Sequence, residues 1–308
     1  MKQKKRKGLR ISDLAHRCLI VLFWFVLTTA VLAPLAPTPL IAGLTTNMFT
    51  ISGLFLALLI FTEACGKFGF LLGEKWSKTA NITYSLILDW LISFVCVIIF
   101  LVDLTRYNPT KNTNPNQTPV LLIHGYLHNS SAWSYFRYRL LTEGHSNVYT
   151  INLGLPIWSI EHYAELIDEK VKEIAKCTGR NDIVLIGHSM GGIIASQWAT
   201  TQTQKIHVKS VITLSSPFQG TKRADVGVGA CAKQLKIGSK FLEQLYNKIQ
   251  DASSTRFFHI GSESDTTIRP LFSAFVSGKP GKIYEKLGHM MYLFSDEVID
   301  DVADYLEV

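Results

Sequence analysis

The stretch that most limits the possible fold is residues 182–195, where a short apolar run ends in a turn rich in glycine. The run Ile183–Ile186 predicts a buried strand. It is followed by Gly-His-Ser-Met-Gly at residues 187–191, and then by a segment whose composition permits a helix, residues 192–200. A G-x-S-x-G sequence between a strand and a helix is the pattern of a nucleophile elbow. The five letters alone could equally be a chance Gly-Ser-Gly turn, but the flanking strand and helix favour the elbow.

The geometry of the turn explains the two glycines of this pattern. Ser189 must sit on a very sharp turn, so the residues two positions before and after it, Gly187 and Gly191, need almost no side chain. The hydroxyl of Ser189 then stands clear of the sheet. An oxyanion beside it lies near the positive end of the following helix, where backbone N–H groups have no helical partner.

Apolar and basic residues are both concentrated in the first third of the chain. The mean hydropathy of +0.19 is high for a wholly soluble protein of 308 residues, and almost all long apolar runs lie before Asp103. Of the net charge of +7, the first seventeen residues carry +6, from seven basic residues and one acid, which leaves +1 for the rest. A basic flank directly before an apolar span indicates membrane topology more economically than a nucleic-acid-binding arm. We therefore expect no nucleic-acid partner.

Residues 1–104 are expected to form a membrane region of about three transmembrane helices. Residues 18–44 carry no charge and are long enough to cross the ~30 Å hydrocarbon layer; their length favours a membrane helix over a cleaved signal peptide. The second segment, residues 48–72, is the weakest and could instead be re-entrant or interfacial. The third, residues 82–104, contains Asp89 about one turn from its start. We place Asp89 near the interface and assign it no chemistry.

The basic N-terminus predicts that the chain begins on the cytoplasmic side. Three spans would then put everything after residue 104 outside, so we expect a multi-pass protein of a bacterial inner membrane with a periplasmic domain. If the second segment does not cross, the domain faces the cytoplasm. The soluble part contains two cysteines, Cys177 and Cys231, and the sequence leaves open whether they pair.

Beyond the membrane region, residues 105–118 are rich in Asn, Thr and Pro and are typical of a polar linker. From residue 119 to residue 308, short apolar runs alternate with helical stretches. This alternation predicts an α/β domain with a mainly parallel sheet and helices on both faces. The expected strands are 119–124, 148–153, 183–186, 208–214, 256–260 and 282–284, and the expected helices are 132–141, 160–177, 192–200 and 296–306.

A serine hydroxyl becomes a good nucleophile only when a base takes its proton, and the base needs an acid to orient it. In enzymes with this elbow the order along the chain is Ser, acid, His. Three histidines follow Ser189, namely His207, His259 and His289. His207 precedes an expected strand and His259 lies within one, whereas His289 follows Gly288 in a loop after the last strand. His289 is therefore the predicted base.

The acid is expected in the loop after the strand that contains His259. Gly261 ends that strand, and the loop offers Glu263 and Asp265. We prefer Asp265, because it lies deeper in the loop that would reach His289, and we keep Glu263 as the alternative.

An oxyanion hole needs two backbone donors, one of them directly after the nucleophile. The predicted donors are the N–H of Met190 and the N–H of Tyr126, which follows an early strand and Gly125. His124 precedes Ser189 in the chain and has no clustered ligand residues near it in sequence, so we interpret it as shaping this loop. We expect His188 to pack beside the elbow.

The sequence resembles bacterial lipases and esterases of the α/β-hydrolase superfamily over residues 119–308. The motifs that carry the resemblance are Val120–Tyr126, Gly187–Gly192, Ser215–Thr221, Ser264-Asp265 and Gly288-His289. The resemblance implies hydrolysis of carboxylic esters through an acyl-enzyme, with no cofactor and no metal. It also implies that Phe218 contacts the acyl group, at a position where related lipases often carry His. Residues 224–250 are the candidate cap over the site, and they leave little room for an elaborate lid.

The leading hypothesis is a membrane-anchored serine hydrolase of lipid or acyl esters, with a catalytic set of Ser189, Asp265 and His289. An acyltransferase or a thioesterase could use the same three residues. A different class is a non-catalytic binding module that keeps the fold, which loss of one of the three residues would have favoured. A transporter built from the apolar segments lacks charged or Gly/Pro-broken pairs that would mark a pathway.

Overall fold

The computed structural model describes Asp89, residues 114–202 and residues 206–307. The chain divides into two units, residues 88–294 with 298–308 and residues 1–87 with 295–297. Of the latter, the structure describes only residues 295–297, at the start of the last helix. The predicted spans 18–44 and 48–72, and all of 82–104 except Asp89, lie outside the described residues. Every helix in the described part is too short or too polar to cross a bilayer.

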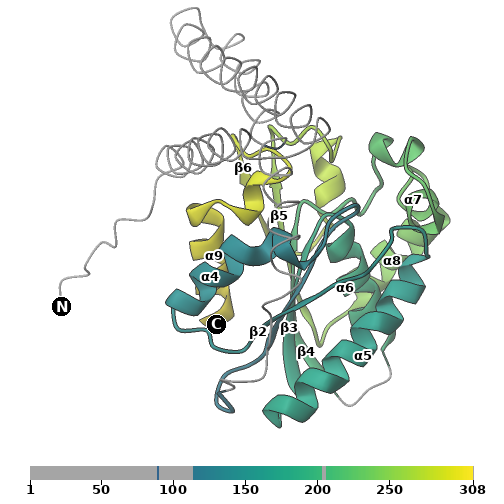
Figure 1. The fold of residues 1–308 in the computed structure, drawn as a ribbon. Helices are drawn as coiled ribbons and strands as arrows, with labels where there is room; N and C mark the ends of the chain where they lie inside the picture. The colour runs from purple at the N-terminus through teal and green to yellow at the C-terminus, as the bar shows by residue number, and fades with distance from the viewer. Residues whose placement is uncertain (1–88, 90–113, 203–205, 308) are drawn as a thin grey trace, which may run out of the picture. The chain divides into compact units, whose positions relative to one another are not determined.

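The expected parallel sheet is confirmed. Within the described residues six strands pair in the order β2-β1-β3-β4-β5-β6, and each neighbouring pair is parallel (Figure 1). The strands are β1 Val120–Ile123, β2 Val148–Ile151, β3 Asp182–His188, β4 His207–Leu214, β5 Arg256–Ser262 and β6 Gly281–Tyr284. The order runs outward from β1 to β2 and then restarts at β3 on the other side of β1. Open α/β sheets bind ligands at the carboxyl ends of the strands where the order reverses in this way.

Helices cover both faces of the sheet (Figure 1). One face carries α5 Ile160–Thr178, α6 Met190–Thr201 and α8 Lys240–Asp251, and the other carries α4 Ser134–Thr142 and α9 Asp296–Glu307. Consecutive residues of β5 show the two faces. Phe257 belongs to the core under α5, α6 and α8, whereas Phe258 packs on Tyr305 of α9 with ring centroids 4.6 Å apart. The shorter elements are α7 Ala230–Gln234 and the 3-10 helices η2 Ser130–Trp133, η3 Lys222–Asp225, η4 Leu271–Ala274 and η5 Met291–Leu293.

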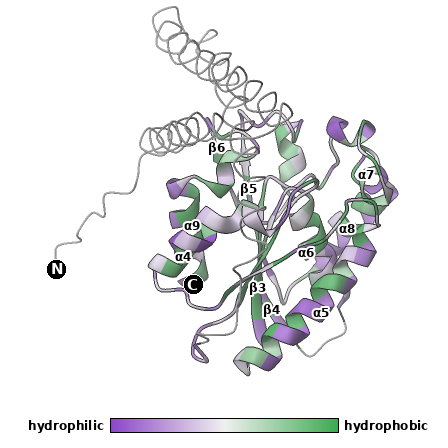
Figure 2. Ribbon diagram, viewed as in Figure 1, coloured by the Kyte–Doolittle hydropathy of each residue, from purple (hydrophilic) through white to green (hydrophobic). Residues whose placement is uncertain are grey.

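Helix α5 shows how local sequence sets an element. The Ser159 side chain accepts a hydrogen bond from the N–H of His162 at the start, and Gly179 ends the helix with φ of 71°. Along one face, at intervals of three and four residues, lie the buried side chains of Tyr163, Ile167, Val171 and Ile174. Figure 2 shows the alternation of apolar and polar residues along this helix, beside the apolar strands β3 and β4.

Candidate active site

Ser189 occupies the sharp turn between β3 and α6. Its backbone has φ of 55° and ψ of −123°, a conformation that non-glycine residues seldom adopt. The turn is held from both sides, because the Ser189 N–H donates to the carbonyl of Leu214 on β4 and the Ser189 carbonyl accepts from the N–H of Gly192. Strained backbone that the surrounding structure holds in place is typical of functional sites.

Close backbone contacts explain the glycines around Ser189. A Cβ atom at Gly187 would lie 2.4 Å from the Cα of Gly192, and one at Gly191 would lie 2.1 Å from the carbonyl oxygen of Ile123 on β1. Real Cβ atoms do not approach backbone atoms this closely. The elbow therefore needs glycine at both positions for its strand and helix to meet.

We expect Gly191→Ala to destabilise the fold by about 3 kcal/mol, the upper part of the usual range for overpacking, because the clashing atom is backbone and cannot rotate away. Urea unfolding of the full-length protein measures this. Ser196→Ala on the same helix adds no atom and removes one hydrogen bond, from the Ser196 hydroxyl to the carbonyl of Gly192. Ser196→Ala, which should lower the unfolding midpoint less than Gly191→Ala, is the control. An unfolding midpoint of Gly191→Ala equal to that of the wild type would contradict the clash.

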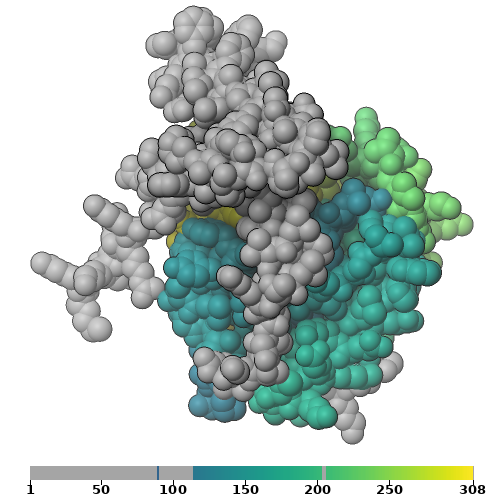
Figure 3. Space-filling view, in the orientation of Figure 1, coloured from purple at the N-terminus to yellow at the C-terminus, as the bar shows by residue number. Residues whose placement is uncertain are grey.

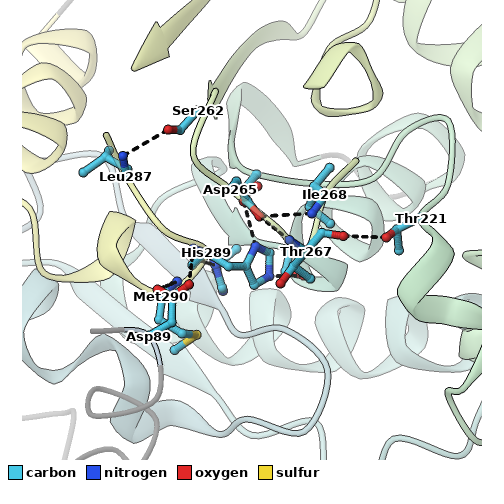
Figure 4. A network of polar contacts seen from close by, with 12 residues as sticks. Asp89, Thr221, Ser262, Asp265, Thr267, Ile268, Leu287, His289 and Met290 are labelled. Atoms are coloured by element: carbon cyan, nitrogen blue, oxygen red, sulfur yellow. Dashed lines mark hydrogen bonds and ion pairs between the residues drawn. The ribbon is translucent and has the colours of Figure 1, made fainter. Parts of the chain in front are cut away.

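The structure brings Ser189, His289 and Asp265 together in one hydrogen-bonded chain. Nε2 of His289 lies 3.0 Å from the hydroxyl oxygen of Ser189. Nδ1 of the same ring lies 2.9 Å from Oδ2 of Asp265. Figure 4 shows the imidazole between the loop that carries Asp265 and the polar contacts of its own backbone. With the proton on Nδ1, the ring donates to the carboxylate and offers Nε2 to accept the serine proton.

Asp265 is the loop acid that reaches His289, and its carboxylate is held from several directions. Oδ1 accepts from the N–H groups of Thr267, at 2.7 Å, and Ile268, at 3.0 Å. Oδ2 accepts from His289 and from the hydroxyl of Ser215. The residue is only 1% exposed, and these bonds are what permit a buried charge. The alternative acid, Glu263, is exposed at the surface.

Asp265 and His289 each stabilise the charged form of the other. Burial disfavours the ionised form of Asp265, but the nearby His289 charge and the hydrogen bonds from His289 and Ser215 outweigh it and lower the pKa of Asp265. Burial also disfavours the imidazolium of His289, but the charge and hydrogen bond of Asp265 outweigh it and raise the pKa of His289. The arrangement thus suits a base that must hold a proton briefly.

The other histidines near the sheet have structural positions. Nε2 of His188 donates to the carbonyl of His289, at 2.8 Å, so His188 packs beside the elbow. His124 accepts from the N–H of Leu153 at 3.0 Å and shapes the loop after β1. His259 is buried in β5, and the exposed His207 begins β4. Within the described residues no group of His, Cys, Asp and Glu could hold a metal ion.

The two residues predicted to donate to an oxyanion lie near Ser189, Met190 in sequence and Tyr126 in the lining of the same pocket. Met190 is the first residue of α6, directly after the nucleophile position. Tyr126 follows Gly125, whose added Cβ would lie 2.9 Å from the Cβ of Ser189, so the loop after β1 passes directly over the elbow. The hydroxyl of Tyr126 bonds both the carbonyl and the N–H of Val228. The loop after β1 is thereby fixed to the segment after η3.

A largely apolar pocket opens at Ser189 and His289. It encloses about 620 Å³ not filled by atoms, counting its open mouth. Besides Ser189 and His289 its lining includes backbone and side chains from the loops after β1, β4 and β5, among them Tyr126, His128, Pro217, Arg223, Ala224, Ala232, Leu235 and Ile268. The pocket therefore lies at the carboxyl ends of the strands, where the strand order reverses.

Phe218, the predicted acyl contact, is not among the residues that line this pocket. Its side chain is 1% exposed and packs edge-on against His259, with ring centroids 4.8 Å apart. Its neighbour Pro217 lines the pocket instead. Phe218 supports the wall from within the core.

Only the first part of the candidate cap, residues 224–250, lies over the pocket. Ala224, Gly227, Ala232 and Leu235 line it, whereas α8 buries its apolar face in the core. Cys231 of this segment is buried, Cys177 is exposed, and both are free thiols. The two cysteines therefore do not pair in this structure.

The contacts of several residues around the site were not predicted from the sequence. Ser215, Thr267 and Ile268 bind the Asp265 carboxylate, and His128 and Arg223 line the pocket. Ser215 has φ of 51°, unusual for a serine. Its place at the end of an expected strand was the available signal, since loops after parallel strands meet at one edge.

Comparison with known proteins agrees with this fold. Residues 120–245 match the model of a family described as the Alpha/beta hydrolase family. The mature form of Bacillus licheniformis lipase BlEst2 superposes with a TM-score of 0.55 at 17% identity, over 65% of this chain and 96% of that one. Aspergillus fumigatus lipase B gives a TM-score of 0.54 at 16% identity, over 66% of this chain and 55% of that one. No curated protein matches the sequence significantly. The described domain has the α/β-hydrolase fold.

Proposed function

We propose that the protein is a serine hydrolase that cleaves carboxylic esters, with Ser189 as nucleophile, His289 as base and Asp265 as orienting acid. The observation that carries the proposal is the continuous hydrogen-bonded chain from the Ser189 hydroxyl through His289 to Asp265, at the mouth of an apolar pocket. The fold is consistent with it, but hosts many other functions, so the argument rests on the site.

The reaction proceeds in two halves. The Ser189 oxygen attacks the ester carbonyl carbon while Nε2 of His289 takes the hydroxyl proton, and the carbonyl oxygen becomes an oxyanion beside the N–H groups of Met190 and Tyr126. The tetrahedral intermediate collapses, the C–O bond to the alcohol breaks, and Nε2 returns the proton to that leaving oxygen. Water then attacks the acyl-enzyme with the same proton transfers, which releases the acid and restores Ser189.

Lipid or acyl esters are the proposed substrates. The pocket lining is mainly apolar, and three exposed apolar side chains adjoin lining residues, namely Leu127, Val226 and Val228, which are 74%, 82% and 70% exposed. Figure 3 shows blue atoms from the start of the described domain next to green atoms from the part of the chain after β4. The hydrogen bond between the Tyr126 hydroxyl and the Val228 carbonyl joins these two parts. Exposed apolar side chains beside an apolar pocket favour contact with a water-insoluble substrate. The apolar segments of residues 1–104 support anchoring to a membrane that holds such lipids.

Labelling by a fluorophosphonate probe, together with turnover of p-nitrophenyl esters from short to long acyl chains, tests the proposal on the full-length protein. Labelling with turnover supports ester hydrolysis, and the chain-length profile separates esterase from lipase behaviour. Labelling without turnover would point to acyl transfer to an acceptor other than water. Folded protein that shows neither would favour a non-catalytic binding module.

We expect activity to depend on pH through His289. The base must be neutral to accept the serine proton, and its pKa is raised above the ordinary value of 6.5. Hydrolysis should therefore be low in acid and rise with pH through a midpoint above 6.5. The pH profile of kcat/KM reports this ionisation in the free enzyme. A midpoint well below 6.5 would contradict the assigned base.

A further inference from the structure

Asp89, far from the other site residues in sequence, contacts the loop that carries His289. Its Oδ2 accepts a hydrogen bond of 2.7 Å from the N–H of His289, and its Oδ1 accepts one of 2.7 Å from the N–H of Met290. Figure 4 shows the carboxylate facing these two consecutive amides. One carboxylate thus binds the two backbone amides that flank the Cα atom of His289.

Gly288 makes room for this carboxylate. A Cβ atom at residue 288 would lie 2.7 Å from each oxygen of Asp89 and 2.8 Å from its Cγ. The φ of Gly288 does not lie in the left-handed region. The contact with Asp89, and not the backbone conformation, is therefore what an added side chain would disturb.

Two other hydrogen bonds that hold this loop are weaker in kind. The N–H of Leu287 donates to the hydroxyl of Ser262 at 3.0 Å, and the carbonyl of His289 accepts from His188 at 2.8 Å. Both are bonds between neutral groups when His188 is neutral, and burial holds the pKa of His188 well below its ordinary value. Burial raises the pKa of the Asp89 carboxyl to about 6, so the group is ionised above that pH. Hydrogen bonds to an ionised carboxylate are about twice as strong as bonds between neutral groups.

We propose that Asp89 is a positioning residue for the base, holding the backbone of His289 and Met290 so that the imidazole stays aligned between Ser189 and Asp265. This proposal rests on the proposed function. A displacement of about 1 Å at a catalytic group can cost about 10²-fold in rate, so two bonds at the backbone of the base have a large effect on turnover.

The Asp89 charge also acts on the imidazole. The charged or titratable groups that face His289 are Asp265, Asp89, Arg223, His128 and His188. The two carboxylates favour the imidazolium, and Arg223 disfavours it. Removal of the Asp89 charge should therefore lower the pKa of His289 and move the acid limb of the pH profile to lower pH.

The test compares Asp89→Asn, Asp89→Ala, Gly288→Ala and the double variant Asp89→Ala/Gly288→Ala in the full-length protein. Asp103→Asn, another acid of the same apolar segment, is the matched control. We expect Asp89→Ala to lower kcat/KM by about tenfold to a hundredfold, mainly through kcat. Asp89→Asn should lose less activity and shift the acid limb to lower pH. Because Gly288→Ala removes the same contact, the double variant should be no worse than Asp89→Ala alone.

Amide hydrogen exchange of the peptide around residues 287–291 gives a readout that needs no turnover. We expect faster exchange at His289 and Met290 in Asp89→Ala and unchanged exchange in Asp103→Asn. Unchanged exchange at these amides in Asp89→Ala would overturn the proposal, as would an unchanged pH profile and activity. Faster exchange at these amides in Asp89→Ala, combined with a wild type that hydrolyses no ester, would support the contact and refute the proposed function alone.

Discussion

Replacement of Ser189 by alanine is expected to lower kcat/KM for a p-nitrophenyl ester by about four to six orders of magnitude. The substitution removes the hydroxyl that we propose forms the acyl-enzyme, while His289, Asp265 and the backbone donors stay in place. What remains is the weaker acceleration that an oxyanion hole and substrate binding give to attack by water. Hydrolysis rates and fluorophosphonate labelling, measured on the same preparation, check this loss.

Ser196→Ala is the matched control, because Ser196 is a buried serine of the same helix whose hydroxyl bonds to the carbonyl of Gly192. It should keep labelling and most of the activity. If Ser189→Ala is labelled at the wild-type rate, another residue is the nucleophile and the proposed mechanism is wrong.

The sheet and its main helices could be predicted because their information is local. The stripe of Tyr163, Ile167, Val171 and Ile174 predicts an amphipathic helix, and α5 follows it within one residue at its end. The elbow could be predicted for the same reason, because a strand-turn-helix of this shape brings backbone atoms so close to Gly187 and Gly191 that only glycine fits there. The spacing of residues along the chain is therefore enough to predict these elements.

Side-chain direction was harder to predict than position. Phe218 lies in the predicted loop, but its ring packs on His259 while Pro217 faces the pocket. A one-residue shift reverses which side chain meets a cavity, and nothing in a loop sequence fixes that register. The prediction of a cap over residues 224–250 was similarly wrong for its last part, because the apolar face of α8 packs into the core and does not cover the site.

The long-range contact made by Asp89 could not be predicted from the sequence. Asp89 reaches the loop of His289 across 200 residues of sequence. Within an apolar segment an isolated acid indicates an interface or a function, but no spacing rule names its partner. Only the folded chain shows that Gly288 leaves the space for it.

Asp265→Asn is expected to lower kcat/KM by about 10³ to 10⁴-fold. Asparagine keeps the size of the side chain but places an amide where the carboxylate accepts from His289 and Ser215. If the amide NH₂ faces Nδ1, the ring turns to the tautomer whose Nε2 carries the proton and can no longer accept from Ser189. If the amide oxygen faces Nδ1, the NH₂ opposes the N–H groups of Thr267 and Ile268. Either orientation costs a buried hydrogen bond and the charge that stabilises the imidazolium.

The residual activity of Asp265→Asn should also have a changed pH profile. The Asp265 charge is the largest of the influences that raise the pKa of His289, so its loss should move the acid limb to lower pH. Glu263→Gln is the control, because Glu263 is the other acid of the same loop and is exposed. It should keep the wild-type rate and midpoint. The opposite pattern, loss in Glu263→Gln with activity retained in Asp265→Asn, would mean that the loop rearranges in solution and that Glu263 orients the base.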